Sequence, residues 1–488
     1  MKIKGIAIGI AVLLLVIAAA AVAADPTDKS FGTDGIAEIE ARVQGGPRDE
    51  EVGGIVDLER ASGGELLAAV YPIARGGHYF AAARIGRDGS LDKSFGEAGF
   101  TPRIKFHQRK GETEGGVLQA EAVAQAGNGD VVLAGYFENA GALAPALARF
   151  TSAGALDPSF GHGGTVVPRP SGEGGVLRIS ETGGEELHDV AVEPDGTIVG
   201  VGDVVPGHSF DHRSPRQPSA SVIAYRADGS IDKGFGHGGR FQVKGPRGGG
   251  FTGFTEVKAL PSGKLLVSGY VHNQLVLYRL TAAGRTDRSF GGGDGKVTVG
   301  RQTSEDSPGF IRAPFGVAPD GSIFLCGTTF SKSIQDAQPV VLVRFSAAGR
   351  LDRGFGKSIY AEQTPADRRP PLTHRKHVEA YHFEPQGLAV DGQGRIVVTG
   401  GETAPYTRGQ QEAGYQYFAA RRFLANGRRD KGFGDGGVFA TNPPGSQSYA
   451  RSAVTEGNGQ VVGGGWIQIE RGGGNGPGNT AMLLTRYR

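Results

Sequence analysis

Short apolar runs of β type recur along the whole chain, and each follows a tight polar turn and ends near a glycine. Clear copies are GNGDVVLAG (127–135), PSGKLLVSG (261–269) and GNGQVVGGG (457–465), and SGGELLAAV (62–70) is a weaker one. Asp-Gly and Asn-Gly supply the positive φ that two-residue hairpin turns need. Because apolar and β-branched residues flank each turn, the pattern predicts a β-hairpin at every copy. The remaining copies lie at 194–202, 319–327 and 392–400.

A third apolar run follows each hairpin, and in most units it ends at an arginine five residues before a glycine, as in ALARFTSAG (146–154). Ala224 takes the place of that arginine in one unit. A pentapeptide of the form Asp-(Lys, Arg or Pro)-(Ser or Gly)-Phe-Gly comes next, and a short run such as GKVTV (295–299) closes the unit. The steps between pentapeptides are 64, 65, 75, 55, 65 and 78 residues, which indicates an array of equivalent units that pack on one another. The pentapeptides begin at Asp28, Asp92, Asp157, Asp232, Asp287, Asp352 and Asp430.

Seven units of four strands predict an all-β fold, a seven-bladed β-propeller with four antiparallel strands per blade. The last unit stops after its third run, AMLLTRYR (481–488), and its missing fourth strand matches GIAEIE (35–40), right after the first pentapeptide. We therefore expect the N-terminal strand to close the last blade, which leaves no blade edge open between the termini. Residues 25–488 are expected to form one domain.

The units resemble the delta-60 β-propeller repeats of secreted bacterial proteins. The resemblance rests on turns such as LDPSFGHGG (156–164) and on the hairpins of PDG-strand-Gly type, and it covers all seven units. It implies a propeller fold and an exported protein, and it implies no catalytic residue. Within each pentapeptide we expect the phenylalanine to pack between blades. The aspartate should accept hydrogen bonds from its own turn and from the arginine that ends the third strand.

Residues 1–24 have the pattern of a signal peptide: a basic start, an apolar run, and small residues at Ala21-Val22-Ala23. This predicts a secreted or extracytoplasmic protein of the cell envelope, with no membrane span after cleavage. An uncleaved anchor is the alternative, because the run from 5 to 24 is just long enough to cross a bilayer.

Charge and cysteine content narrow the function classes. Removal of residues 1–24 takes away two of the 52 basic residues and none of the 50 acidic ones, so the mature chain is neutral. No basic stripe is present, and nucleic acid is therefore excluded as a partner. The single cysteine, Cys326, lies in a predicted strand at a position that holds small residues in other units, which indicates packing rather than nucleophilic chemistry.

Strand alternation puts the two tight turns of each unit at one end of the ring and two connections of variable length at the other. Long loops on a rigid scaffold often carry function, so the variable-loop face is the expected working face. Two of these loops hold histidine clusters, which either form a metal site or are solvated loop histidines. The clusters are His208, Asp211 and His212, and His374, His377 and His382.

The innermost strands align on the glycine of each hairpin turn, and their aligned residues should ring the channel mouth on the variable-loop face. Such a ring can hold a divalent cation or a polar ligand, and a hydrated channel entrance is the alternative. The position seven residues before that glycine holds Asp57, Ala122, Asp189, Glu256, Pro314, Gly387 and Ser452. The position before it holds Val56, Glu121, His188, Thr255, Ala313, Gln386 and Arg451. The candidate ligand-binding residues are Asp57, Glu121, His188, Asp189, Glu256, Gln386 and Arg451.

No single catalytic motif stands out in the sequence. We therefore expect a monomeric, non-catalytic binding or interaction module without a resident cofactor, whose partner on the variable-loop face is a protein, a glycan or a small molecule. The alternative is a propeller hydrolase or lyase with a polar, metal-assisted site at the channel mouth. The sequence does not name the ligand in either case.

Overall fold

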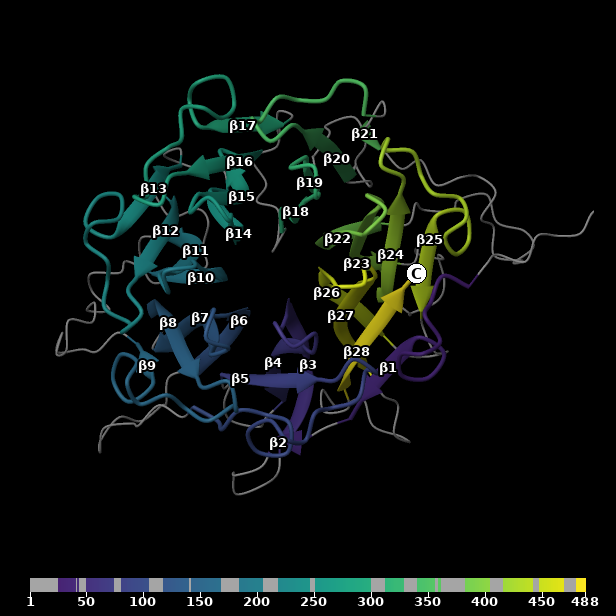
Figure 1. The fold of residues 1–488 in the computed structure, drawn as a ribbon, viewed down its shortest axis with the longest axis horizontal. Coiled ribbons are helices and arrows are strands. Elements are labelled where there is room, and N and C mark those ends of the chain that lie inside the picture. The colour runs from purple at the N-terminus through teal and green to yellow at the C-terminus, as the bar shows by residue number, and fades with distance from the viewer. Residues whose placement is uncertain are drawn as a thin grey trace, which may run out of the picture.

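The computed structural model shows seven sheets of four strands arranged as blades around a central axis (Figure 1). This confirms the predicted seven-bladed propeller, and the part of the chain that is described contains strands and turns but no helix. It accordingly offers no helical segment that could span a membrane. The predicted signal peptide, 1–24, lies outside the described residues. These are 25–40, 42–43, 50–73, 80–104, 117–139, 142–167, 184–204, 218–245, 251–299, 312–328, 340–355, 359–360, 382–403, 416–441, 447–468 and 480–488.

The first four blades follow one another along the chain (Figure 1). The first sheet holds β2 (Arg42–Val43), β3 (Glu50–Arg60), β4 (Leu66–Ile73) and β5 (Ala81–Ile85). The second holds β6 (Val117–Gln125), β7 (Val131–Asn139), β8 (Ala142–Phe150) and β9 (Thr165–Val166). The third holds β10 (Glu185–Val192), β11 (Ile198–Val204), β12 (Ser219–Tyr225) and β13 (Arg240–Lys244). The fourth holds β14 (Gly253–Ala259), β15 (Leu265–Val271), β16 (Gln274–Leu280) and β17 (Lys296–Val299).

The last three blades complete the ring. The fifth sheet holds β18 (Phe315–Val317), β19 (Ile323–Thr328), β20 (Val340–Phe345) and β21 (Ile359–Tyr360). The sixth holds β22 (His382–Val390), β23 (Ile396–Thr403), β24 (Gln416–Phe423) and β25 (Val438–Thr441). The seventh holds β26 (Ser448–Thr455), β27 (Val461–Gln468), β28 (Thr480–Tyr487) and β1 (Ile36–Ile39).

Two details of the first and last blades concern the chain termini. In the first blade β2 pairs with the start of β3, and the outer strand is a short segment after the pentapeptide, joined to the blade through the bridges Ala83–Phe100 and Phe80–Ile104. In the seventh blade β1 pairs antiparallel with β28, with Ile36 opposite Thr485. The predicted closure of the ring by the N-terminal strand is therefore confirmed.

The pentapeptide phenylalanines are buried between blades, as predicted. Phe95, for example, is fully buried and packs against Gly154 of the next blade. Gly154 has a φ of +87°, and a Cβ there would lie 2.6 Å from the nitrogen of Gly96, so only glycine fits this close approach. The seven side chains are between 0 and 3 % exposed: Phe31, Phe95, Phe160, Phe235, Phe290, Phe355 and Phe433.

The arginine that ends the third strand links three parts of its unit in six of the seven units. In the second blade the Nε of Arg149 donates to Asp157 Oδ2 at 2.7 Å, and the guanidinium lies 4.8 Å from the ring centroid of Phe160. Asp157 Oδ1 accepts the N–H of Ser159 at 3.0 Å, so the aspartate also caps its own turn, as expected. The ion pair recurs as Arg84–Asp92 (2.7 Å), Arg279–Asp287 (2.7 Å), Arg344–Asp352 (3.7 Å), Arg422–Asp430 (2.8 Å) and Arg486–Asp28 (3.1 Å).

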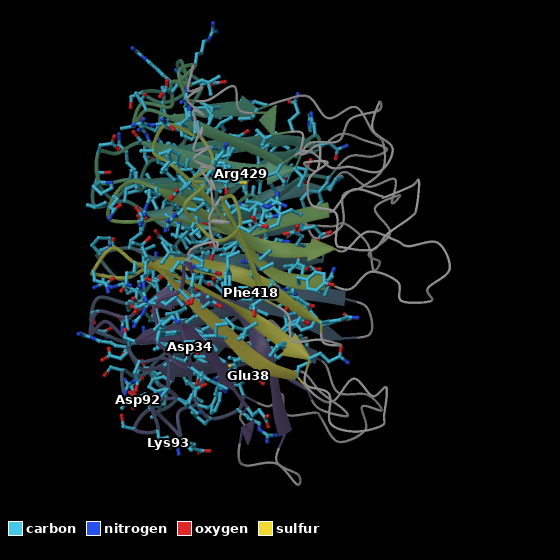
Figure 2. All side chains as sticks on the ribbon, turned by 90° about the vertical axis from the view of Figure 1, so that its right-hand side faces the viewer. Asp34, Glu38, Asp92, Lys93, Phe418 and Arg429 are labelled. Carbon is cyan, nitrogen blue, oxygen red and sulfur yellow. The ribbon has the colours of Figure 1, made fainter. Side chains whose placement is uncertain are left out.

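The antiparallel order puts the hairpin turns and the pentapeptides at one end of the ring, where Figure 2 labels Asp92 and Lys93. The strand ends that flank the variable connections lie at the opposite end. Apart from the short turn at 272–273, most of each variable connection lies outside the described residues, together with the predicted loop cluster around His208 and the histidines at 374 and 377. Cys326 on β19 is fully buried, which confirms its packing role, and burial raises the pKa of its thiol to about 12.

Candidate functional site

The inner strands share a β-bulge that the sequence pattern did not predict. In six blades the pairing register with the second strand shifts by one residue, and the residue left unpaired stands toward the variable-loop end. A bulge bends the strand and re-aims a side chain, and bulges are common next to active sites. The bulged residues are the second aligned set of the sequence: Val56, Glu121, His188, Thr255, Gln386 and Arg451.

The three aligned carboxylates Asp57, Asp189 and Glu256 hold blades together. Each accepts a hydrogen bond from a backbone N–H of the inner strand of the next blade. These carboxylates are therefore bonded within the protein and do not simply line a hydrated channel entrance. Asp189 is only 9 % exposed and also accepts its neighbour's N–H. The inter-blade bonds run from Val123 N to Asp57 Oδ2 (3.1 Å), from Val257 N to Asp189 Oδ2 (2.7 Å), from Phe315 N to Glu256 Oε2 (3.0 Å) and from Leu58 N to Ser452 Oγ (3.2 Å).

Arg312 lies at the centre of this carboxylate layer, and sequence reasoning missed it. It precedes β18 in the fifth blade, yet its Nη2 is 3.4 Å from the main-chain oxygen of Glu121 and 3.7 Å from the Glu121 carboxylate. Glu121 belongs to β6, across the ring axis from β18 (Figure 1). The fifth unit has Ala313 and Pro314 at the two aligned positions. Arg312 directly precedes them, so the alignment did not include it.

Two cations of the protein, Arg312 and Lys258, partly offset the negative charges of this layer. Burial raises the pKa of Asp189 well above its usual range, and the negative charges of Asp57 and Glu256 add to that rise, whereas Arg312 opposes it. Lys258 Nζ lies 3.1 Å from Glu256 Oε1 and donates to the carbonyl of Phe315. A layer that contains its own cations has little need of a metal ion, and these three carboxylates therefore act mainly in the scaffold.

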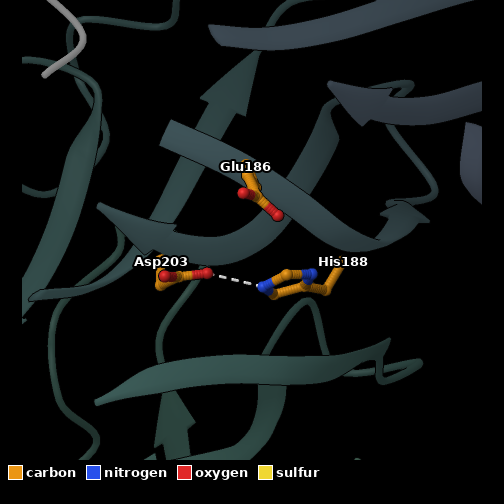
Figure 3. Close-up of side chains that lie close together, drawn as sticks. All are labelled: Glu186, His188 and Asp203. Carbon is orange, nitrogen blue, oxygen red and sulfur yellow. Dashed lines mark hydrogen bonds and ion pairs between the residues drawn. The ribbon is translucent and has the colours of Figure 1, made fainter. Parts of the chain in front are cut away.

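A second group lies on the third blade, at the variable-loop end (Figure 3). His188 Nε2 is 2.5 Å from Asp203 Oδ1, and one ligand atom each from Glu186, His188 and Asp203 fall within 4.8 Å of one another. Glu186 and Asp203 are 5 % and 6 % exposed. Among the described residues, the Glu186 carboxylate has no hydrogen-bond or ion-pair partner, and Figure 3 shows it directed toward the other two side chains.

The electrostatics of this group couple the second and third blades. Burial lowers the pKa of His188, but the hydrogen bond to Asp203 and the nearby negative charges raise it, to about 9. Burial raises the pKa of Glu186 to about 7; the charge of His188 opposes this rise and that of Asp203 adds to it. In the second blade, the charge of Glu121 acts on both groups and that of Glu138 acts on Glu186. Sequence reasoning found His188 and Glu121 but missed Glu186 and Asp203, because their proximity depends on the strand register.

A third group joins the sixth and seventh blades through the Tyr449 hydroxyl, which donates to Glu384 Oε2 at 2.7 Å. Gln386 is 4 % exposed, and its Oε1 has no hydrogen-bond partner in the described part of the chain; the same holds for the buried Nε of Arg451. The Arg451 guanidinium lies 5.9 Å from the ring centroid of Tyr449, which stacks on Trp466 at 6.4 Å with an interplanar angle of 16°. The predicted ring is therefore three groups: the carboxylate layer around Arg312, the acidic group with His188, and the Gln386–Arg451 group.

Comparisons with known proteins support the fold and leave the activity open. A family model described as "Domain of unknown function (DUF5122) beta-propeller" matches residues 126–160 and 260–290, which supports a β-propeller family. None of the curated proteins that were compared matches the chain.

Solved structures with similarity to this chain include proteins with and without a known activity. A protein of unknown function from Dyadobacter fermentans is 11 % identical over 93 % of this chain and 100 % of its own, with a TM-score of 0.38. An inactive variant of virginiamycin B lyase from Staphylococcus aureus is 10 % identical over 92 % and 99 %, with a TM-score of 0.40. The α-L-arabinofuranosidase Arb93A from Fusarium graminearum is 12 % identical over 93 % and 97 %, with a TM-score of 0.37. Scores this low carry no argument about function.

Proposed function

We propose that this chain is an exported, non-catalytic β-propeller binding module whose ligand site lies at the channel mouth on the variable-loop face. One observation carries the proposal: five of the six bulged positions present polar side chains that differ between blades, and Gln386 Oε1 and Arg451 Nε are buried there without a hydrogen-bond partner in the described residues. Buried polar atoms are nearly always bonded in native proteins, so a polar ligand is a suitable partner for these two atoms. The signal-peptide pattern and the likeness to delta-60 repeats support export.

The chemistry of the Gln386–Arg451 group favours a polar ligand with a carboxylate, such as an acidic glycan. A guanidinium binds a carboxylate through parallel N–H donors, and its fork geometry makes that contact selective. Tyr449 and the partly exposed Trp466 add aromatic surface beside it. Ligand sites typically combine a few fixed polar groups with apolar or aromatic walls, and this group has both.

Calorimetric titration with an oligogalacturonate, and with the neutral galactose oligosaccharide of the same length, tests the proposal. The acidic sugar should bind the intact protein and the neutral one should not. Arg451→Ala should weaken binding at least tenfold, because it removes the cation that faces the carboxylate. Arg350→Ala is the matched control, since Arg350 is exposed at the pentapeptide end. Equal binding by the two variants, or no binding of either sugar, would contradict the proposal.

A hydrolase or lyase is the second candidate, and it rests on the His188–Asp203 pair. A carboxylate 2.5 Å from an imidazole nitrogen fixes the ring and makes the histidine a suitable general acid or base. Incubation with acidic polysaccharide and detection of new reducing ends or unsaturated products separates the two candidates. Turnover that disappears in His188→Ala would favour the enzyme, and the absence of turnover would favour the binding module.

A further inference from the structure

The third blade departs from the repeat at one cross-strand pair. Glu186 on β10 stands directly opposite Asp203 on β11, so two acidic side chains face each other two residues from the bulge. A scaffold role would recur from blade to blade, whereas this pairing of acids occurs once among the described equivalents. Those equivalents are Gly54–Tyr71, Gln119–Tyr136, Gly253–Tyr270, Glu384–Gly401 and Tyr449–Trp466.

This pair is unfavourable for the protein alone. Like charges directly opposite on neighbouring strands destabilise a sheet, and buried carboxylates need a cation or hydrogen-bond donors to offset the loss of water. Asp203 has His188 as its donor, but the Glu186 side chain is at least nine-tenths buried and its carboxylate has no hydrogen bond or ion pair with any described residue. Its carboxylate faces the other two groups, and this geometry is that of an incomplete coordination shell.

We infer that Glu186, His188 and Asp203 form a binding site for one divalent transition-metal ion, of the class of Zn²⁺ or Mn²⁺. Bonds of about 2.0–2.2 Å from such an ion to nitrogen and oxygen require ligand atoms a few ångströms apart, and these lie within 4.8 Å of one another. An imidazole suits Zn²⁺ and related ions, whereas Ca²⁺ and Mg²⁺ prefer oxygen alone. Two carboxylates neutralise the charge of the ion. Three protein ligands leave a coordination position open to water or to a bound molecule.

The metal site deepens the proposed function. It rests on that function in one respect only, namely that this end of the ring is the ligand-binding end. Ion binding can be measured without any sugar, so the two proposals fail separately. An ion that binds normally to Arg451→Ala while the acidic sugar no longer binds would support both. An ion that binds when no sugar binds to any form would leave the metal site standing and remove the proposed ligand.

The test uses tag-free mature protein, stripped with a chelator and titrated with Zn²⁺ and with Mn²⁺ in a calorimeter. One ion should bind per chain, and Glu186→Gln and His188→Ala should each weaken it at least a hundredfold. Glu384→Gln is the matched control, because Glu384 is the acid at the same place in the sixth blade, opposite Gly401. It should bind the ion as the intact protein does.

Stability without metal provides a second readout. In chelator, Glu186→Gln should melt at or above the temperature of the intact protein, because one of two facing buried charges is gone. If that variant fails to fold, Asp203→Asn serves in its place for ion binding. Unchanged ion affinity in the folded variants, no stoichiometric ion in the intact protein, or tight Ca²⁺ binding with none of Zn²⁺ or Mn²⁺ would overturn the inference.

Discussion

Arg312 of the fifth blade reaches across the ring to Glu121 of the second, with its Nη2 3.4 Å from the main-chain oxygen and 3.7 Å from the carboxylate. Burial raises the pKa of three carboxylates from three other blades, and the same guanidinium opposes that rise: Asp57, Asp189 and Glu256. One side chain therefore supplies a positive charge to inner strands of several blades. The centre of the propeller is held by charge as well as by packing.

Arg312→Ala should destabilise the protein by about 3 kcal/mol or more, because it leaves buried carboxylates without their cation. Arg312→Lys should lose less, since the charge remains while the forked hydrogen-bond geometry is lost. Chemical denaturation at neutral pH measures both. A combination of Arg312→Ala with Asp189→Asn should recover part of the loss. If Arg312→Ala unfolds at the same denaturant concentration as the intact protein, the guanidinium has no such role.

Asp189→Asn alone should cost about 1–3 kcal/mol, because an amide offers one acceptor oxygen and two backbone N–H groups bond to Asp189. Glu97→Gln is the control, since Glu97 is an exposed acid at the pentapeptide end. It should change the free energy of unfolding by less than about 0.5 kcal/mol. Equal effects of the two substitutions would show that Asp189 does not hold the third and fourth blades together.

Phe160→Ala should destabilise by about 3–5 kcal/mol, because it empties a fully buried position between two blades. It also removes the ring beneath Arg149, so the ion pair with Asp157 loses support. Leu351→Ala is the comparison, since Leu351 is 53 % exposed and should change stability little. Thermal and denaturant melts measure both. A loss below about 1 kcal/mol for Phe160→Ala would mean that the pentapeptide phenylalanines are not essential to blade packing.

Glu193 should make stability depend on pH near neutrality. Burial, with a smaller effect from Asp195, raises its pKa from 4.5 to about 7 in the folded protein. A folded-state pKa above the unfolded value gives stability that is complete below about pH 4.5 and lost as the pH rises through 7. Glu193→Gln should therefore reduce the decline in melting temperature between pH 5 and pH 8, which is the range over which Glu193 titrates.

Asp391 is the control for Glu193, because it occupies the same hairpin position in the sixth blade. It is paired with Arg395 at 2.5 Å and accepts two N–H groups of its own turn. Asp391→Asn should lower the melting temperature at both pH values, since it breaks bonds that are present at both. Melting curves of Glu193→Gln that keep the full pH dependence of the intact protein would show that Glu193 is not its source.

The sequence predicted the blades because their elements are local. A hairpin turn, an arginine and a pentapeptide repeat at near-constant spacing, and the closure of the ring followed from the strand missing after 481–488. The candidate site was only partly predictable. The alignment selected His188 and Arg451, but the bulge that re-aims them, and the register that sets Glu186 opposite Asp203, depend on how strands pair in the folded sheet. The contact between Arg312 and Glu121 depends on the closure of the whole ring, which brings the second and fifth blades to opposite sides of the axis.

An experimental structure of the mature protein soaked with an oligogalacturonate tests the central claim most directly, namely that ligand binding occurs at the channel mouth on the variable-loop face. The account predicts a sugar carboxylate within hydrogen-bond distance of Arg451, with a polar group of the sugar close to Gln386 Oε1. Sugar bound at the pentapeptide end, or bound at the loop end without contact to Arg451 or Gln386, would contradict it.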